Sequence, residues 1–92
     1  MSMREFSIED NLKKILKKLS KKDKATYISL MNKMDEVLTC EDVNHFKNLR
    51  TPLQYLKRVH IKGPFILTFK YIESEDKVVF YDFDYHDNIY SK

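Results

Sequence analysis

The chain has 92 residues, a length that suits one domain with a modest core and excludes two independent domains. Hydrophobic residues make up 42% and aromatic residues 13%, so we expect a packed globule rather than a disordered chain. The net charge is only +3, but residues 43–72 hold six lysines and arginines and no acidic residue. That segment favours an anionic partner such as nucleic acid or an acidic protein.

Several classes of protein are disfavoured by what the chain lacks. No apolar run approaches the roughly 18 to 20 residues of a membrane span, and the first residues lack the apolar core of a secretory signal. Cys40 is the only cysteine, which excludes an internal disulfide and a cysteine metal cluster. We therefore expect a cytoplasmic protein without membrane association, a single domain over residues 1–92, and no metal or other cofactor.

Residues 4–39 predict a short strand followed by two amphipathic helices. Residues 4–8 allow the strand, and Ser7 is expected to cap the first helix. Ser20 is expected to cap the second, with so short a link that the helices form a hairpin. The first helix has its apolar positions at helical spacing, opposite lysines 13, 14, 17 and 18: Leu12, Ile15, Leu16 and Leu19. The second is expected to bury Tyr27, Leu30, Met31, Met34, Val37 and Leu38.

After an irregular stretch over residues 41–52, the hydrophobic period changes from 3.6 to 2. Strands are predicted over residues 54–61, 65–72 and 78–85, joined by turns at Gly63-Pro64 and at residues 73–77. The middle strand is almost entirely apolar, so we expect it at the centre of an antiparallel meander. The predicted fold is α+β, with the helical hairpin packed on one face of a small antiparallel sheet.

The run from Leu56 to Lys62 is the most informative segment for function. Alternate side chains of a strand share a face, so Arg58, His60 and Lys62 are expected to point one way. Lys57, Val59 and Ile61 are then expected on the opposite face. Two cations beside a histidine suit a polyanion, and the histidine exchanges protons near neutral pH.

Two further residues extend this face into a candidate site. The first and third meander strands run in the same direction, so His60 and His86 are expected at one rim of the sheet. Two histidines with Arg58 and Lys62 supply the base, the acid and the cations that RNA cleavage by its own 2′-hydroxyl requires. Tyr90 offers a hydroxyl or a ring on which a base stacks; a core aromatic anchoring the C-terminus is the alternative. No histidine spacing supports a metal site.

The order of elements and three short motifs resemble the RelE/ParE toxin superfamily of toxin–antitoxin modules. The motifs are FKNLR at 46–50, LKRVHI at 56–61 and HDNIY at 86–90. The histidines are placed most like those of the YafQ branch of ribosome-dependent messenger-RNA endonucleases. The loop, strand and C-terminal histidines of that branch fall on His45, His60 and His86, and its final aromatic falls on Tyr90.

This resemblance implies a type II toxin that cuts messenger RNA in the ribosome by metal-independent acid–base chemistry. It also implies a RelB-like antitoxin, bound to the toxin in a hetero-oligomer. Catalytic roles are expected for His60, His86, Arg58 and Tyr90, with His86 the leading acid. RNA binding is expected from the remaining polar residues of the segment: His45, Lys47, Arg50, Lys57 and Lys62.

The sequence also departs from the family pattern and leaves rival functions open. Ile66 stands where relatives carry an arginine, and Pro64-Phe65 replaces the acid–tryptophan pair of the YafQ branch. A gyrase-inhibiting toxin like ParE is the main alternative, because ParE relatives share the fold and do not cleave RNA. An RNA-binding domain that has lost the chemistry is the other.

Overall fold

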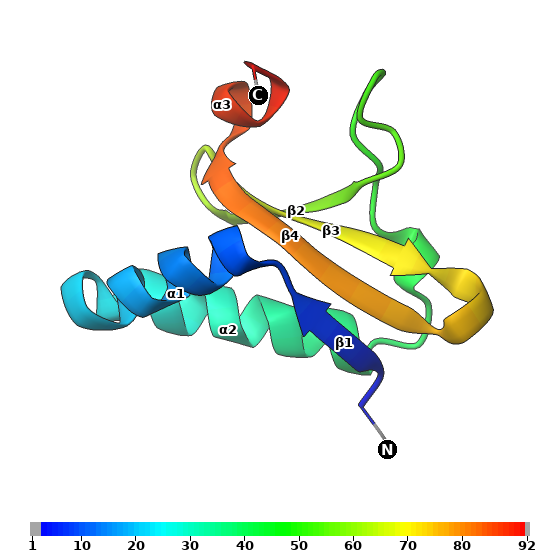
Figure 1. The fold of residues 1–92 in the computed structure, drawn as a ribbon, viewed down its shortest axis with the longest axis horizontal. Helices are drawn as coiled ribbons and strands as arrows, with labels where there is room; N and C mark the ends of the chain where they lie inside the picture. Colours follow the sequence, from blue (N-terminus) through cyan, green and yellow to red (C-terminus); the bar gives the residue numbers. More distant parts are fainter. Residues whose placement is uncertain (1–2, 92) are drawn as a thin grey trace.

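The computed structural model describes residues 3–91 and shows a helical hairpin packed on a sheet (Figure 1). In chain order the elements are β1 (Glu5–Ile8), α1 (Asp10–Lys22), α2 (Lys24–Thr39), η1 (Val43–His45), β2 (Lys57–Lys62), β3 (Phe65–Ile72), η2 (Glu73–Glu75), β4 (Lys77–Tyr85) and α3 (His86–Ser91). Residues 1, 2 and 92 of the expected domain lie outside the described residues. Within residues 3–91, no helix has both the length and the apolar character needed to cross a bilayer.

Within residues 3–91 the sheet has four strands in the order β1-β4-β3-β2. The predicted meander is confirmed, because β2 pairs antiparallel with β3 and β3 pairs antiparallel with β4. The short first strand is also confirmed, but β1 runs parallel to β4, so the sheet is mixed rather than antiparallel. This pairing joins residues about 70 positions apart, which no local sequence pattern reveals. The α+β class holds.

The two faces of the sheet carry separate apolar cores. The helical hairpin covers one face, and α3 lies on the other side (Figure 1). The main core contains Leu12, Leu30, Met34, Val37, Leu38, Val43, Leu67, Phe69, Val78, Phe80 and Phe83. The small core contains Leu49, Leu56, Ile66 and Ile89. The expected burial of Met31 is wrong: it is 37% exposed, because it lies at the border of the face that Leu30 and Met34 bury.

Both predicted helix caps are wrong by a few residues. Ser7 lies in β1, and α1 begins three residues later. Ser20 lies inside α1, where its hydroxyl donates to the carbonyl of Lys17 at 2.7 Å. Asp23 caps α2 instead, since its carboxylate accepts from the backbone N–H of Thr26 at 3.2 Å and from the Thr26 hydroxyl at 2.6 Å. A carboxylate that accepts both donors is the stronger cap.

An irregularity in β4 changes which side chains face the hairpin. Thr68 pairs with Asp82 and Phe69 pairs with Phe80, so Tyr81 is an extra residue in β4. Phe80 and Phe83 both enter the main core although they are three positions apart. A β-bulge has this effect because the extra residue shifts the alternation of the strand by one.

A second irregularity lies at the end of β2. His60 pairs with Ile66 and Lys62 pairs with Phe65, which leaves Ile61 as the extra residue. Phe65 packs against the main core, so Lys62 shares the hairpin face with it. The expectation that Arg58, His60 and Lys62 share one face is therefore wrong for Lys62 and holds for the other two.

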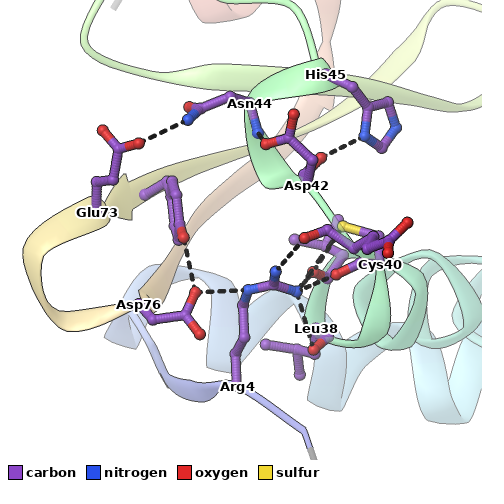
Figure 2. A network of polar contacts seen from close by, with 11 residues as sticks. Arg4, Leu38, Cys40, Asp42, Asn44, His45, Glu73 and Asp76 are labelled. Atoms are coloured by element: carbon purple, nitrogen blue, oxygen red, sulfur yellow. Dashed lines mark hydrogen bonds and ion pairs between the residues drawn. The ribbon is translucent and has the colours of Figure 1, made fainter. Parts of the chain in front are cut away.

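Arg4 joins three segments that are distant in the sequence (Figure 2). Its guanidinium donates to the carbonyl oxygens of Leu38 at 3.4 Å, Glu41 at 3.1 Å and Cys40 at the end of α2. It also pairs with the carboxylate of Asp76, in the turn between β3 and β4, at 2.8 Å. The last carbonyls of a helix have no partner within the helix, so this cation stabilises the end of α2 and fixes β1 beside it.

Candidate active site

Arg58 and His60 form a direct pair on the sheet face opposite the hairpin. Their partners across β3 are Thr68 and Ile66, and Ile66 belongs to the small core of that face. A guanidinium nitrogen of Arg58 lies 3.1 Å from Nε2 of His60. Because a guanidinium only donates, this contact is a hydrogen bond in the neutral tautomer of His60 that carries its proton on Nδ1. A cation and the lone pair of a base therefore lie side by side.

A shallow groove follows the outer edge of β2 past this pair. It is lined by His45, Phe46, Lys47, Arg58, Val59 and His60. The backbone N–H of Arg58 donates to the carbonyl of Lys47 at 2.9 Å, which holds the loop against the strand. Nδ1 of His45 bonds the carbonyl oxygen of Asp42 (Figure 2). Since that oxygen only accepts, Nδ1 carries the proton, and Nε2 of neutral His45 keeps a lone pair.

Tyr90 contacts a second group of side chains on the same face. Its hydroxyl oxygen accepts from the backbone N–H of Arg50 at 2.7 Å, and the Arg50 guanidinium lies 5.1 Å from the ring centre. The ring of His86 lies 5.2 Å from the ring of Tyr90. Burial alone would raise the pKa of Tyr90. Hydrogen bonds from Arg50 and the charges of Arg50 and Arg58 outweigh it and hold the pKa below the usual 10.0.

His86 begins α3 directly after β4. Its backbone N–H donates to the carbonyl of Pro64 at 2.9 Å, so it lies beside the β2–β3 turn. That is the end of the sheet where His60 lies, as expected from the meander. The two histidines stand on either side of β3: His60 lies in the row of Ile66 and Asp84, and His86 follows Asp84 by two residues. Nδ1 of His86 is 3.6 Å from the carboxylate of Asp87.

Two of the lysines predicted to bind RNA lie apart from this cluster. Lys57 is 8% exposed, and its ammonium donates to the carbonyl of Phe46 at 3.2 Å and to the side chain of Asn48 at 3.0 Å. It holds the 46–48 loop on β2. Lys62 lies near Asp23: hydrogen bonds from Thr26 lower the pKa of Asp23, and the charge of Lys62 acts in the same direction. Both are therefore left out of the cluster proposed below.

Comparison with known proteins places the chain in a family. A protein of Methanocaldococcus jannaschii named "Putative toxin RelE4" is 48% identical over 90 residues, which span 98% of this chain and 94% of that protein. The chain belongs to the RelE toxin family. An uncharacterized protein of Methanosarcina mazei is 40% identical over 92% of this chain and 96% of its own length. No protein-family model matches.

Two solved structures share the RelE-family fold of this chain. One is the toxin–antitoxin complex RelBE2 of Mycobacterium tuberculosis, with a TM-score of 0.71, 17% identity and coverage of 94% of each chain. The other is YafQ of Escherichia coli, with a TM-score of 0.63, 17% identity and coverage of 95% of this chain and 98% of that one. At this identity the likeness shows the fold alone, and it agrees with the predicted α+β architecture.

The departures of this RelE-family chain from the family pattern have structural reasons. Ile66, which replaces an expected arginine, is fully buried in the small core beneath α3. Phe65 stacks on Tyr85 with ring centres 4.3 Å apart, next to the main core. Both positions serve packing. Over residues 3–91, no group of three or more His, Cys, Asp or Glu side chains is arranged to hold a metal ion.

One feature of the site has no counterpart in the sequence-based prediction. A pocket opens beside Arg58, lined by Leu53, Tyr55, Leu56, Thr68, Tyr81, Asp82 and Ile89. Strict alternation from Asp82 would place Tyr81 on the hairpin face, so the strand pattern alone does not predict that Tyr81 lines this pocket. The signal that existed was the succession of aromatic residues in β4, which is compatible with either face.

Proposed function

We propose that this RelE-family toxin is an endoribonuclease that cuts messenger RNA in the ribosome without a metal ion. The observation that supports it is the single strip of groups on one sheet face. His60 contacts Arg58, and Tyr90 contacts both Arg50 and His86. Arg58 is also among the charges that lower the pKa of Tyr90. The strip combines two histidines with two arginines, which suits a phosphate between an acid and a base.

The proposed reaction uses the 2′-hydroxyl of the substrate as the nucleophile. When Arg58 turns to the phosphate, Nε2 of His60 is released and takes the proton of that hydroxyl. The bond from the 2′-oxygen to phosphorus forms while the bond from phosphorus to the 5′-oxygen breaks. His86 gives its proton to the leaving oxygen, so the products end in a 2′,3′-cyclic phosphate and a 5′-hydroxyl. Because β3 lies between the two histidines, the phosphate is proposed to sit over β3 with one histidine on each side.

The other residues of the strip hold the substrate in this proposal. Arg58 and Arg50 stabilise the charge that develops on the phosphate oxygens. Tyr90 positions the nucleotide between Arg50 and His86. His45 and Lys47 extend the groove along β2 and contact the RNA on that side.

The partners follow from the same proposal. The neighbouring structure from Mycobacterium tuberculosis is a toxin–antitoxin complex, and we infer that a RelB-like antitoxin binds this chain in a hetero-oligomer and covers the cationic groove. Action on translating ribosomes places the protein in the cytoplasm. Inhibition of gyrase, as in ParE-like toxins, and RNA binding without cleavage are the rival functions.

The test maps messenger-RNA ends in translating cells that express the wild type, His60→Ala or His86→Ala. We expect wild-type cuts at preferred codons with 5′-hydroxyl ends, and each substitution to reduce the cutting by about 10²- to 10⁴-fold. Lys33→Gln, a change at a half-buried position of α2 that removes an ion pair with Glu36, is the control and is expected to cut normally. Growth arrest without cuts, or cutting that neither histidine affects, would contradict the proposal.

A further inference from the structure

The pocket lies one strand away from Arg58, because Thr68, which lines it, pairs with Arg58 across β2 and β3. Its volume is about 160 Å³. Thr68 pairs with Arg58 on one side and with Asp82 on the other, so a single row of the sheet joins the pocket to the arginine. Ile89, another lining residue, precedes Tyr90. A nucleotide whose phosphate lies at Arg58 would therefore have this pocket about one strand spacing away, within reach of its base.

The bulge in β4 builds the pocket. If β4 continued in register past Asp82, Tyr81 would pair with Phe69 and face the hairpin. Phe80 takes that place instead, and Tyr81 lines the pocket beside Asp82. A bulge gives up a pair of the ladder, and bulges occur often beside active sites, where they redirect a side chain. Here the redirected side chain is an aromatic ring.

The chemistry of the lining suits a flat ring with a polar edge. Two tyrosines stand at the surface, Tyr55 with 53% and Tyr81 with 37% of its area exposed. The walls are apolar, from Leu53, Leu56 and Ile89. Thr68 and Asp82 line the same pocket. The Thr68 hydroxyl donates to the carbonyl of Asp82 at 3.3 Å. The Asp82 carboxylate accepts from the side chain of Asn11 at 3.2 Å and from the backbone N–H of Phe83 at 2.8 Å. Aromatic rings that are exposed beside a cationic groove are the usual platform for bases of single-stranded RNA.

We propose that this pocket holds one unstacked nucleobase of the RNA strand whose phosphate lies at Arg58, with Tyr81 and Tyr55 as its stacking partners. The inference rests on the proposed function, since it names the part of the substrate that the same site takes. It makes Tyr81 and Tyr55 residues that position the substrate, in addition to the histidines and arginines that act on the phosphate.

The test is a double-mutant cycle between Tyr81 and the RNA. The probe is a fluorescent ten-nucleotide RNA with 2′-O-methyl groups, which block cleavage, and with one abasic nucleotide placed at each position in turn. For the wild type, one abasic position is expected to weaken binding by about 5- to 100-fold, the range of one base–aromatic stack. For Tyr81→Leu the same replacement is expected to have little further effect. Tyr55→Leu is expected to act in the same direction.

The matched control is Tyr85→Leu. Tyr85 is 48% exposed in the same strand but stacks on Phe65, outside the pocket, and is expected to keep the wild-type pattern. The salt dependence separates stacking from charge. Tyr81→Leu is expected to leave the slope of log affinity against log salt unchanged, whereas Arg58→Gln lowers it by about 0.7. Thermal unfolding of each variant checks that it is folded.

Three outcomes would overturn the inference. In the first, the wild type does not bind the decamer, or its affinity falls equally for every abasic position. In the second, the effects of Tyr81→Leu and of the abasic nucleotide on the binding free energy are additive. In the third, Tyr81→Leu loses antitoxin binding while it keeps RNA binding. Because the probe resists cleavage, the cycle is independent of the cutting assay. If Tyr81 and one abasic position are coupled but no messenger RNA is cut in cells, the proposed nuclease activity is refuted and the base pocket stands. If messenger RNA is cut but no coupling is found, the base pocket is refuted and the nuclease activity stands.

Discussion

At His60 the contact with Arg58 decides which ring nitrogen accepts a hydrogen bond. Arg58 donates to Nε2 of His60, and the carbonyl of Asp42 accepts from Nδ1 of His45, so each neutral ring keeps its proton on Nδ1. His86 has a carboxylate within 3.6 Å, which an imidazolium can pair with. Both contacts are compatible with the proposed roles of His86 as the acid and His60 as the base.

Asp76 offers a test of a single charge. Hydrogen bonds from the Tyr71 hydroxyl at 2.6 Å and from Arg4 at 2.8 Å hold the pKa of Asp76 below its usual 3.8. A carboxyl whose pKa is lowered on folding stabilises the protein above its unfolded pKa, and loses that contribution as the pH falls through the folded pKa. Its φ of 49° is left-handed, a conformation that asparagine also tolerates.

We therefore expect Asp76→Asn to lower the free energy of unfolding at pH 7 and to have a much smaller effect at pH 2.5. Urea unfolding of both proteins at a series of pH values measures the difference. The substitution keeps the size and backbone preference of the residue, so the change reports the charge. A difference that stays constant from pH 7 to pH 2.5 would contradict this assignment.

At the scale of elements, the repeated positive charges of α1 destabilise this helix when it is considered by itself. It contains lysines 13, 14, 17, 18, 21 and 22, all exposed, which form four i,i+4 pairs. Each such pair destabilises a helix by about 0.2–0.5 kcal/mol. The helix persists because Leu12 and its apolar neighbours pack on the main core.

Lys17→Glu is expected to stabilise the protein. It turns two repulsive i,i+4 pairs, with Lys13 and Lys21, into attractive ones, and the sum is about 1 kcal/mol. For a domain of this size that raises Tm by about 4–8 °C. Lys17→Gln, which only removes the repulsion, should give about half the rise. Both effects should shrink in 1 M NaCl because exposed charges are screened; a rise that ignores salt would refute the explanation.

For the whole molecule, the division into two cores separates global stability from the order of the site. The main core joins the hairpin to the sheet, while the small core holds α3 and the loop before β2. A helix as short as α3 is not stable by itself. It is held by Ile89 in the small core, by the bond from His86 to Pro64, and by the bond between Arg50 and Tyr90.

Ile89→Ala is therefore expected to destabilise α3 locally, whereas Leu30→Ala is expected to destabilise the whole fold. Leu30 is fully buried in the main core, and its truncation is expected to lower the free energy of global unfolding by about 2–5 kcal/mol. Ile89→Ala is expected to increase hydrogen exchange mainly in α3, with β3 and β4 still protected, and to reduce RNA cutting strongly. Uniform loss of protection in both variants would show that the molecule has a single cooperative core.

Much of this architecture follows from the sequence by itself. Helical spacing placed α1 and α2, period-two alternation placed the meander, and one glycine at the β2–β3 turn separated its first two strands. The same alternation put Arg58 and His60 on one face, and the parallel direction of β2 and β4 brought His86 to their rim. Such features depend on local periodicity, which the chain carries regardless of its partners.

Tertiary structure alone decided the positions that break this periodicity. The bulge at Ile61 moved Lys62 to the hairpin face, and the bulge at Tyr81 opened the pocket. Lys57 forms a hydrogen bond to the 46–48 loop, and β1 pairs with β4, which is distant in the sequence. A bulge and a distant pairing are set by how a strand meets its partner and core. One inserted residue reverses every side chain beyond it, and no window of sequence contains that partner.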